Sequence, residues 1–181
     1  MNGEASLWIF GYGSLIWSPA FPFQERVVAS AQGWTRRFYQ GSPDHRGTPL
    51  APGRVVTLVP APDERCWGVA YRVAGDQVSR ILEALDQRES AGYERVTVSL
   101  DVPSLDAPLE ALTYAAGPNN PQYLGQASLV EMAAQMRACS GPSGRNRDYL
   151  TALAEALRDL QIRDAHVESL ERELVRHDRS D

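Results

Sequence analysis

The chain has 181 residues, which is enough for one domain with its own hydrophobic core, and we expect a single domain over residues 1–181. Its formal net charge is -5 and it has no lysine- or arginine-rich run, so nucleic acid and anionic membrane surfaces are not expected partners. The apolar stretch that follows Glu4 is interrupted by Gly11 after only a few residues, so neither a signal peptide nor a membrane span is expected there.

The cysteines and histidines show no pattern typical of a metal site. Cys66 and Cys139 stand far apart without CxxC spacing. Of the histidines His45, His166 and His177, the last two fall in a strongly charged terminal segment, where structural or solvated roles are expected. We therefore expect no metal, and the cysteine usage fits a reducing, cytoplasmic location.

The first two thirds of the chain favour strands, because short β-branched or aromatic runs alternate with Gly, Pro and Asp clusters. One amphipathic helix over 75–89 interrupts them, with Ile81 and Leu85 in an apolar stripe that is expected to lie on the sheet. The segment "PAPDE", Pro60 to Glu64, is typical of a hairpin turn. The expected strands cover 7–10, 26–30, 36–40, 55–59, 66–73, 95–102 and 111–115.

The last third of the chain favours helices. Ser128 and Glu131 have the spacing of a capping box, so a helix is expected to begin there. Apolar residues recur at helical period over 146–160 and again over 164–177. Together these patterns predict an α+β fold with an antiparallel or mixed sheet that can curl into a barrel, followed by a helical C-terminal third.

The stretch "WIFGYGSLIW" ends a predicted strand in two glycines. Gly11 and Gly13 would let a ligand approach the main chain, and the N–H groups from Gly13 to Leu15 could converge on an anion or oxyanion. A bulge or tight turn without a ligand is the structural alternative. The stretch lacks a nucleotide-binding fingerprint, and Ser14 lacks the GxSxG pattern of a serine hydrolase.

The stretch "LDQRESAGYERV" places Glu89 at the C-terminal end of the predicted helix, where the helix dipole repels negative charge. If this carboxyl is also buried, its pKa is expected to rise, which suits general acid and base chemistry near neutral pH. An ordinary solvent-facing glutamate is the alternative.

A long segment rich in turn-forming residues runs from Gln40 to Val55 and carries several charged side chains. Loops of this length inside compact domains are often functional. The alternative is a solvated loop in which Asp44 and Arg46 form a weak ion pair.

Six stretches of the sequence together resemble one known family: "FGYGSLIW", "FYQGSPDHRGTPLAPGRVVTLV", "WGVAYRV", "LDQRESAGYERV", "NNPQYLG" and "GPSGRNRDYL". In order and spacing they look like the ChaC-like family of γ-glutamylcyclotransferases, from about Trp8 to about Leu174. The resemblance implies a small mixed β-barrel flanked by helices. It also implies a cytoplasmic enzyme that cleaves glutathione, its small-molecule substrate, into 5-oxoproline and cysteinylglycine without a cofactor.

The same resemblance assigns the site. The catalytic glutamate of the family falls on Glu89. The chain departs from a common form of the motifs at Pro43, Ser90 and Ala91, which bears on the shape of the pocket and on substrate choice. The substrate loop of the family falls on Phe10, Gly11, Tyr12, Gly13, Ser14 and Leu15.

The rest of the substrate needs groups that grip a carboxylate and a peptide, and an arginine can hold a carboxylate with two parallel hydrogen bonds. The secondary candidates for this role are Arg37, Gln40, Asp44, His45, Arg46, Arg54 and Tyr149.

In the reaction that this reading implies, the α-amine of the γ-glutamyl group attacks its own γ-carbonyl, and Glu89 transfers the protons. Two alternatives stay open. One is the same cyclisation of other γ-glutamyl amino acids or amines, and the other is a non-catalytic module that binds a γ-glutamyl metabolite or a protein. Glu89 argues against the second, since binding an ammonium does not call for a carboxylate at a helix end.

Overall fold

The structure is a computed structural model that describes residues 5–178, with side chains described as far as Arg176. The segment before Ala5 and the side chain of His177 lie outside the described residues. The chain forms two compact units. The first comprises residues up to 35 together with 59–115, and the second comprises residues 36–58 together with those from 116 onward. The expectation of a single domain stays a prediction.

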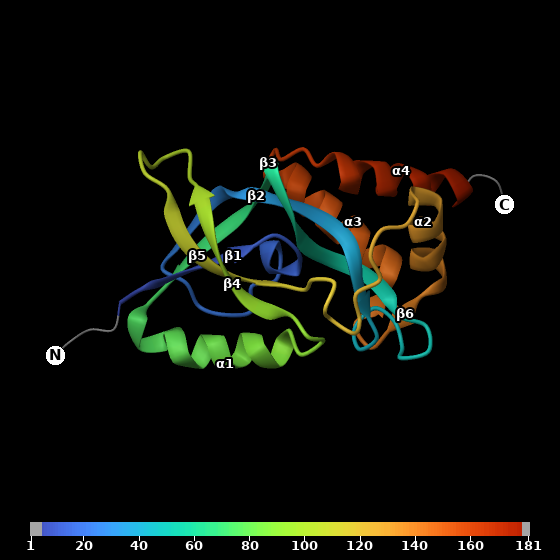
Figure 1. Cartoon of the computed structure of the whole chain (residues 1–181), viewed down its shortest axis with the longest axis horizontal. Coiled ribbons are helices and arrows are strands. Elements are labelled where there is room, and N and C mark those ends of the chain that lie inside the picture. The colour runs from blue at the N-terminus through green and yellow to red at the C-terminus, as the bar shows by residue number, and fades with distance from the viewer. Residues whose placement is uncertain (1–4, 179–181) are drawn as a thin grey trace. The chain divides into compact units, whose positions relative to one another are not determined.

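The strands form a closed five-stranded barrel with the order β1-β3-β2-β4-β5 (Figure 1). Strands β1, β4 and β5 belong to the first unit, whereas residues 36–42 of β2 and 53–58 of β3 are counted in the second. Strand β1 pairs antiparallel with β3 and parallel with β5, while β4 pairs antiparallel with both β2 and β5. The predicted α+β fold with a mixed barrel is therefore confirmed. The strands are β1 (Leu7–Gly11), β2 (Glu25–Ser42), β3 (Gly53–Val73), β4 (Glu94–Asp101) and β5 (Leu109–Ala115).

Two strands are much longer than the sequence predicts. The segments 26–30 and 36–40 both belong to β2, and Gly33, with a φ of 76°, lies within that strand without ending it. The predicted hairpin turn over Pro60 to Glu64 is wrong, because β3 runs through it. Both prolines of "PAPDE" are exposed, and proline, which has no backbone N–H, is compatible with a strand wherever no neighbouring strand needs a donor at that position.

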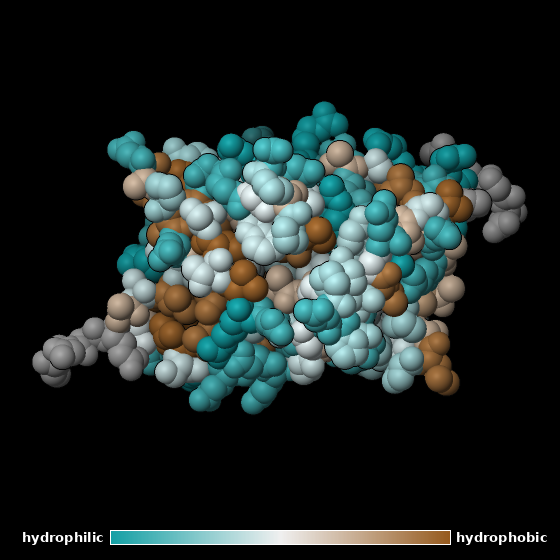
Figure 2. All heavy atoms as spheres, viewed as in Figure 1, coloured by the Kyte–Doolittle hydropathy of each residue, from teal (hydrophilic) through white to brown (hydrophobic). Residues whose placement is uncertain are grey.

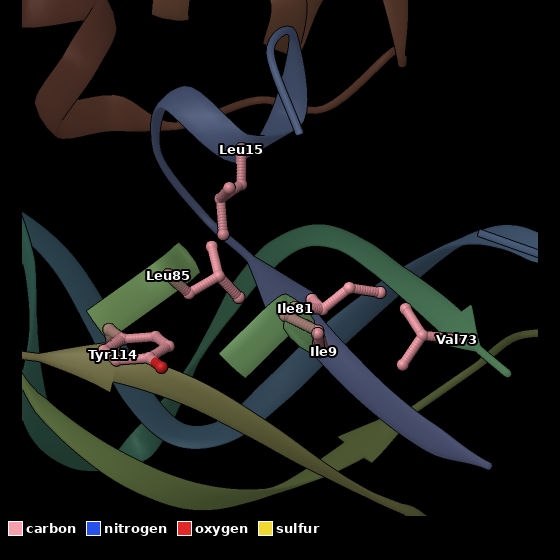
Figure 3. Packing of buried hydrophobic residues seen from close by; sticks show 6 residues of the cluster. All are labelled: Ile9, Leu15, Val73, Ile81, Leu85 and Tyr114. Atoms are coloured by element: carbon pink, nitrogen blue, oxygen red, sulfur yellow. The ribbon is translucent and has the colours of Figure 1, made fainter. Parts of the chain in front are cut away.

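Helix α1 (Val78–Arg88) follows a short 3-10 turn over Gly75–Gln77 and packs on the sheet as predicted. Figure 3 shows its Ile81 and Leu85 among buried side chains of β1, β3 and β5. Burying one such isoleucine or leucine stabilises the fold by about 1.5–3 kcal/mol. The cluster consists of Ile9, Leu15, Val73, Ile81, Leu85 and Tyr114.

The second unit contains the helices α2 (Leu129–Ala138), α3 (Asn146–Asp159) and α4 (Ala165–Asp178), which pack against one another (Figure 1). A two-stranded hairpin of β6 (Ser140–Gly141) and β7 (Gly144–Arg145) precedes α3. The predicted capping box is confirmed, since the N–H of Glu131 donates to Ser128 Oγ and the N–H of Ser128 donates to the Glu131 carboxylate.

Hydrophilic residues cover much of the face drawn in Figure 2, and hydrophobic residues appear there as separate patches. Among residues 5–178, no helix is both long and apolar enough to cross a membrane.

Candidate active site

The glycine-containing stretch forms a tight turn at the end of β1. A single 3-10 turn, Ser14–Ile16, follows Gly13, whose carbonyl accepts a hydrogen bond from the N–H of Ile16 at 2.9 Å. A Cβ atom on Gly11 would lie 2.7 Å from the Cβ of Leu15, so this glycine lets the turn fold back onto its own strand. We call residues 11–16 the β1 turn.

Side chains from the neighbouring strands hold the β1 turn in place. The hydroxyl of Tyr12 donates to the main-chain oxygen of Tyr114 at 2.6 Å, and the hydroxyl of Tyr71 donates to that of Leu15 at 2.7 Å. The hydroxyl of Thr113 on β5 donates to the carbonyl of Phe10, which is on β1 just before the turn, at 2.8 Å. The ring of Tyr12 is buried, so this side chain is held fixed within the protein.

Glu89 is the C-cap residue of α1, and its N–H donates to the carbonyl of Leu85 at 2.8 Å. Its side chain is only 18 % exposed. The carboxylate is therefore held close to the protein at a helix end, the position that the sequence predicts for it.

Arg88 connects this carboxylate to the β1 turn. Its guanidinium donates from Nη2 to Ser14 Oγ at 2.7 Å and from Nη1 to the carbonyl of Ser18 at 2.8 Å. Its Nε lies 3.7 Å from Glu89 Oε1. Arg88 is not among the site residues predicted from the sequence, because a basic residue in the last turn of a helix is explained by the helix dipole alone.

A second polar cluster lies beside the turn on the same unit, and it too is absent from the predicted site residues. Arg95 on β4 donates from Nε to Asp86 Oδ1 at 2.9 Å, and the Tyr114 hydroxyl donates to that carboxylate at 2.6 Å. Hydrogen bonds from Arg95 and Tyr114 lower the pKa of Asp86. Burial and the bond to Asp86 raise the pKa of Tyr114 to about 12, so this tyrosine stays protonated at neutral pH.

The secondary candidates all lie in the second unit, where Arg54 is a structural hub. Its Nη1 donates to the carbonyls of Phe38 and Gly125, both at 2.9 Å, and its Nε donates to Gln135 Oε1 at 2.7 Å. Asn146 holds the main chain of Arg54 through two further hydrogen bonds of 2.7 Å. Burial lowers the pKa of the Arg54 guanidinium, and protein atoms accept its hydrogen bonds.

The segment 43–52 links β2 and β3, so the predicted long loop is shorter than expected at both ends. Arg46 lies over the ring of Tyr149, 5.6 Å from its centroid. Nδ1 of His45 is 3.0 Å from Ser143 Oγ, and its Nε2 is 3.8 Å from the Asp44 carboxylate. The four candidates of this segment and its surroundings therefore lie near one another: Asp44, His45, Arg46 and Tyr149.

The other two candidates are on β2. Arg37 donates from Nη1 to the carbonyl of Arg36 at 2.8 Å, and Gln40 is fully buried and forms a bridge with Tyr123. Within the part of the chain that the structure describes, no group of three or more His, Cys, Asp or Glu side chains could hold a metal ion.

The sequence and the fold are both similar to those of known proteins. Residues 7–177 match the family model described as ChaC-like protein. The chain is 43% identical over 178 residues to "Glutathione-specific gamma-glutamylcyclotransferase 1" of Danio rerio, covering 96% of this chain and 91% of the relative. It is 44% identical over 179 residues to "Gamma-glutamylcyclotransferase 2-3" of Arabidopsis thaliana, covering 95% and 89%.

The fold is similar to a crystal structure of the γ-glutamyl cyclotransferase specific to glutathione from yeast, with a TM-score of 0.90 and 27% identity. That match covers 96% of this chain and 97% of the yeast chain. Since the family model spans nearly the whole sequence, the chain belongs to the ChaC-like protein family.

Proposed function

We propose that this protein is a γ-glutamylcyclotransferase that cleaves glutathione into 5-oxoproline and cysteinylglycine. The observation that carries the proposal is a mostly buried carboxylate, Glu89, joined by one guanidinium to the β1 turn. The similarity over nearly full length to relatives named for this activity supports it.

The substrate supplies its own nucleophile. The free α-amine folds back onto the γ-amide carbonyl, a new C–N bond closes the five-membered lactam, and the bond to the cysteinyl nitrogen breaks. Because the two groups are tethered, the protein has mainly to hold the folded conformer, and well-oriented internal reactions reach effective molarities of about 10⁵ M or more.

Proton transfer is the task of Glu89 in this proposal. The amine arrives as an ammonium with three protons and the lactam nitrogen keeps one, so two protons have to move. The carboxylate accepts each in turn and returns it to the departing cysteinyl nitrogen, which leaves as an ammonium. Positioned transfers of this kind contribute on the order of 10² to 10⁴ in rate. The carboxylate ends the reaction in its starting state, and no atoms other than protons are exchanged with the substrate.

The β1 turn has the complementary task. Negative charge gathers on the former carbonyl oxygen as the ring closes, and main-chain N–H groups from Gly13 to Leu15 would meet either that oxygen or the substrate's α-carboxylate. The first N–H groups of a helical turn have no acceptor within it, which suits such a role. The ring of Tyr12 would pack against the γ-glutamyl group.

The candidates for gripping the cysteinylglycine portion remain those named from the sequence, which are Arg37, Gln40, Asp44, His45, Arg46 and Tyr149. Arg54 is the least suited of the secondary candidates, because three protein acceptors already engage its guanidinium. We further propose that the protein is cytoplasmic. In this proposal glutathione is its small-molecule partner, and the reaction uses no cofactor.

A second candidate is the same cyclisation on other γ-glutamyl amino acids or amines. The plant relative is named for the cyclotransferase reaction without reference to glutathione, and Ser90 and Ala91 next to Glu89 distinguish this chain from a common form of the family motif.

The test is to incubate the purified protein with glutathione and with a panel of γ-glutamyl amino acids and γ-glutamylamines, and to quantify 5-oxoproline and the second product. Release of cysteinylglycine with a kcat/KM at least tenfold above the rest of the panel supports the glutathione assignment. A higher value for another compound supports the second candidate. If no compound yields 5-oxoproline, the protein is not a cyclotransferase and the non-catalytic binding module takes its place.

A further inference from the structure

We propose that Arg88 is a positioning residue that sets the charge state of Glu89 and the conformation of the β1 turn together. The inference rests on the proposed function, in which Glu89 takes a proton and the turn binds the reacting group. It extends that function to a residue that is not among the site residues assigned above by resemblance.

The geometry uses the planar shape of the guanidinium. Nη2 donates to Ser14 Oγ of the β1 turn at 2.7 Å, and Nη1 donates to the carbonyl of Ser18 just after the turn at 2.8 Å, so this end of the group fixes the turn and the segment that follows it. Nε, on the other edge, faces Glu89 Oε1 at 3.7 Å, which is an electrostatic contact rather than a hydrogen bond. Lysine carries the same charge but lacks the rigid fork that reaches both sides.

The charges around the helix end favour this role. A carboxylate at the C-terminus of α1 is opposed by the helix dipole, and the positive charge of Arg88 offsets that repulsion, favouring the ionised form that can accept a proton. The other acid near this end, Asp86, has its own cation in Arg95 of β4 and a hydrogen bond from Tyr114 of β5. Arg88 is thus available for Glu89.

The same contact assigns a role to Ser14. Its oxygen accepts a hydrogen bond from Arg88, so the serine acts as the point at which the guanidinium grips the turn. A nucleophilic serine would instead need a neighbouring base to take its proton, and a guanidinium is a donor that cannot do so.

The experiment measures kcat and KM for glutathione as a function of pH in a set of single variants. Arg88→Ala is expected to lower kcat by about ten- to a hundredfold, since the turn and the base are both displaced. It should also move the acid limb of the kcat profile to higher pH, because the carboxylate loses the charge that keeps it ionised. Arg80→Ala, an exposed arginine on the same helix, is the matched control and should change neither.

Two conservative variants separate charge from hydrogen bonding. Arg88→Lys keeps the charge, so its acid limb should stay near that of the wild type while its KM rises. Arg88→Gln keeps hydrogen-bond donors without charge, so its acid limb should move as in Arg88→Ala. Ser14→Ala should raise KM a few-fold and leave the acid limb of the kcat profile unchanged. If Arg88→Ala does not fold, the lysine and glutamine variants carry the test.

A titration without substrate distinguishes failure of this inference from failure of the proposed function. The side-chain carboxyl carbon of Glu89, assigned by its loss in Glu89→Gln, is followed by NMR in the wild type and in Arg88→Gln. A midpoint at higher pH in the variant supports the coupling even if the protein releases no 5-oxoproline from any substrate. If the enzyme is active but Arg88→Gln has the same Glu89 titration midpoint and the same acid limb of kcat as the wild type, the role of Arg88 is overturned. The cyclotransferase assignment would be unaffected by that result.

Discussion

Two arginines, one in each unit, hold loops in place, yet they do so in different surroundings. Arg54 is 6% exposed, and its side chain donates to the carbonyls of Phe38 and Gly125 and to the Gln135 amide. The side chain of Arg88 is 26% exposed and lies between a hydroxyl, a carbonyl and the carboxylate of Glu89. Both arginines have a carboxylate within electrostatic reach, Glu131 for Arg54 and Glu89 for Arg88. The difference is that burial and neutral acceptors make Arg54 a structural cross-link, whereas Arg88 joins the β1 turn to a carboxylate at a helix end.

The largest effect is expected at the carboxylate. Glu89→Gln should fold normally and bind glutathione with near-normal affinity, yet lose on the order of 10² to 10⁴ in turnover, because an amide cannot take a proton from the ammonium. Initial rates of 5-oxoproline release measure the loss, and circular dichroism checks the fold. Turnover above a few per cent of the wild-type value would remove Glu89 from the role of base.

Arg54→Ala tests the other side of the comparison. The substitution leaves buried carbonyls without their donor, so the free energy of unfolding should fall by about 3 kcal/mol or more. Denaturant unfolding followed by fluorescence gives the value. Arg46→Ala, which removes a cation–π contact with Tyr149, is the control and should cost about 1 kcal/mol or less. Similar losses for both variants would mean that Arg54 is not the hub of its unit.

The second unit should also lose stability in acid through His166. Burial, with Arg37 as a further cause, lowers the pKa of this histidine from 6.5 to about 4 in the folded chain, and its Nε2 accepts the N–H of Phe38 at 3.1 Å. The unfolded chain therefore binds the proton more tightly, and the free energy of unfolding should fall by about 2–3 kcal/mol as the pH drops from 6.5 to 4.

Unfolding curves of the wild type and of His166→Gln over this pH range measure the effect. Glutamine keeps an acceptor for Phe38 but does not titrate, so the part of the slope due to the histidine should vanish in the variant. Parallel pH profiles for the two proteins would contradict the assignment.

The smallest effect is expected at Tyr114. Tyr114→Phe removes the hydroxyl that donates to Asp86 but keeps the main-chain oxygen that accepts from Tyr12. The β1 turn should therefore keep its anchor, and kcat/KM for glutathione should stay within about threefold of the wild type, roughly the effect of one modest hydrogen bond. A loss as large as that of Glu89→Gln would place the phenol in the chemistry itself.

The helices could be predicted from the sequence because their signals are local. The apolar stripe of α1 and the capping box of α2 each depend on residues three or four positions apart, and both appear where the pattern places them. The lengths of β2 and β3 could not be predicted in this way. Gly33 and the "PAPDE" segment look like strand ends, but a strand can pass through either when its neighbours do not need the missing contacts.

By itself, the sequence determined the order of the motifs, the class of the fold and the position of Glu89 at the end of a helix, since each depends on spacing along the chain. Only the tertiary structure decided which arginine meets that carboxylate and the β1 turn. Arg88 and Ser14 are 74 positions apart, and the packing of α1 against β1 brings them within 2.7 Å. No local pattern encodes such a contact, because it is the buried apolar face of the helix that sets where its last turn lies.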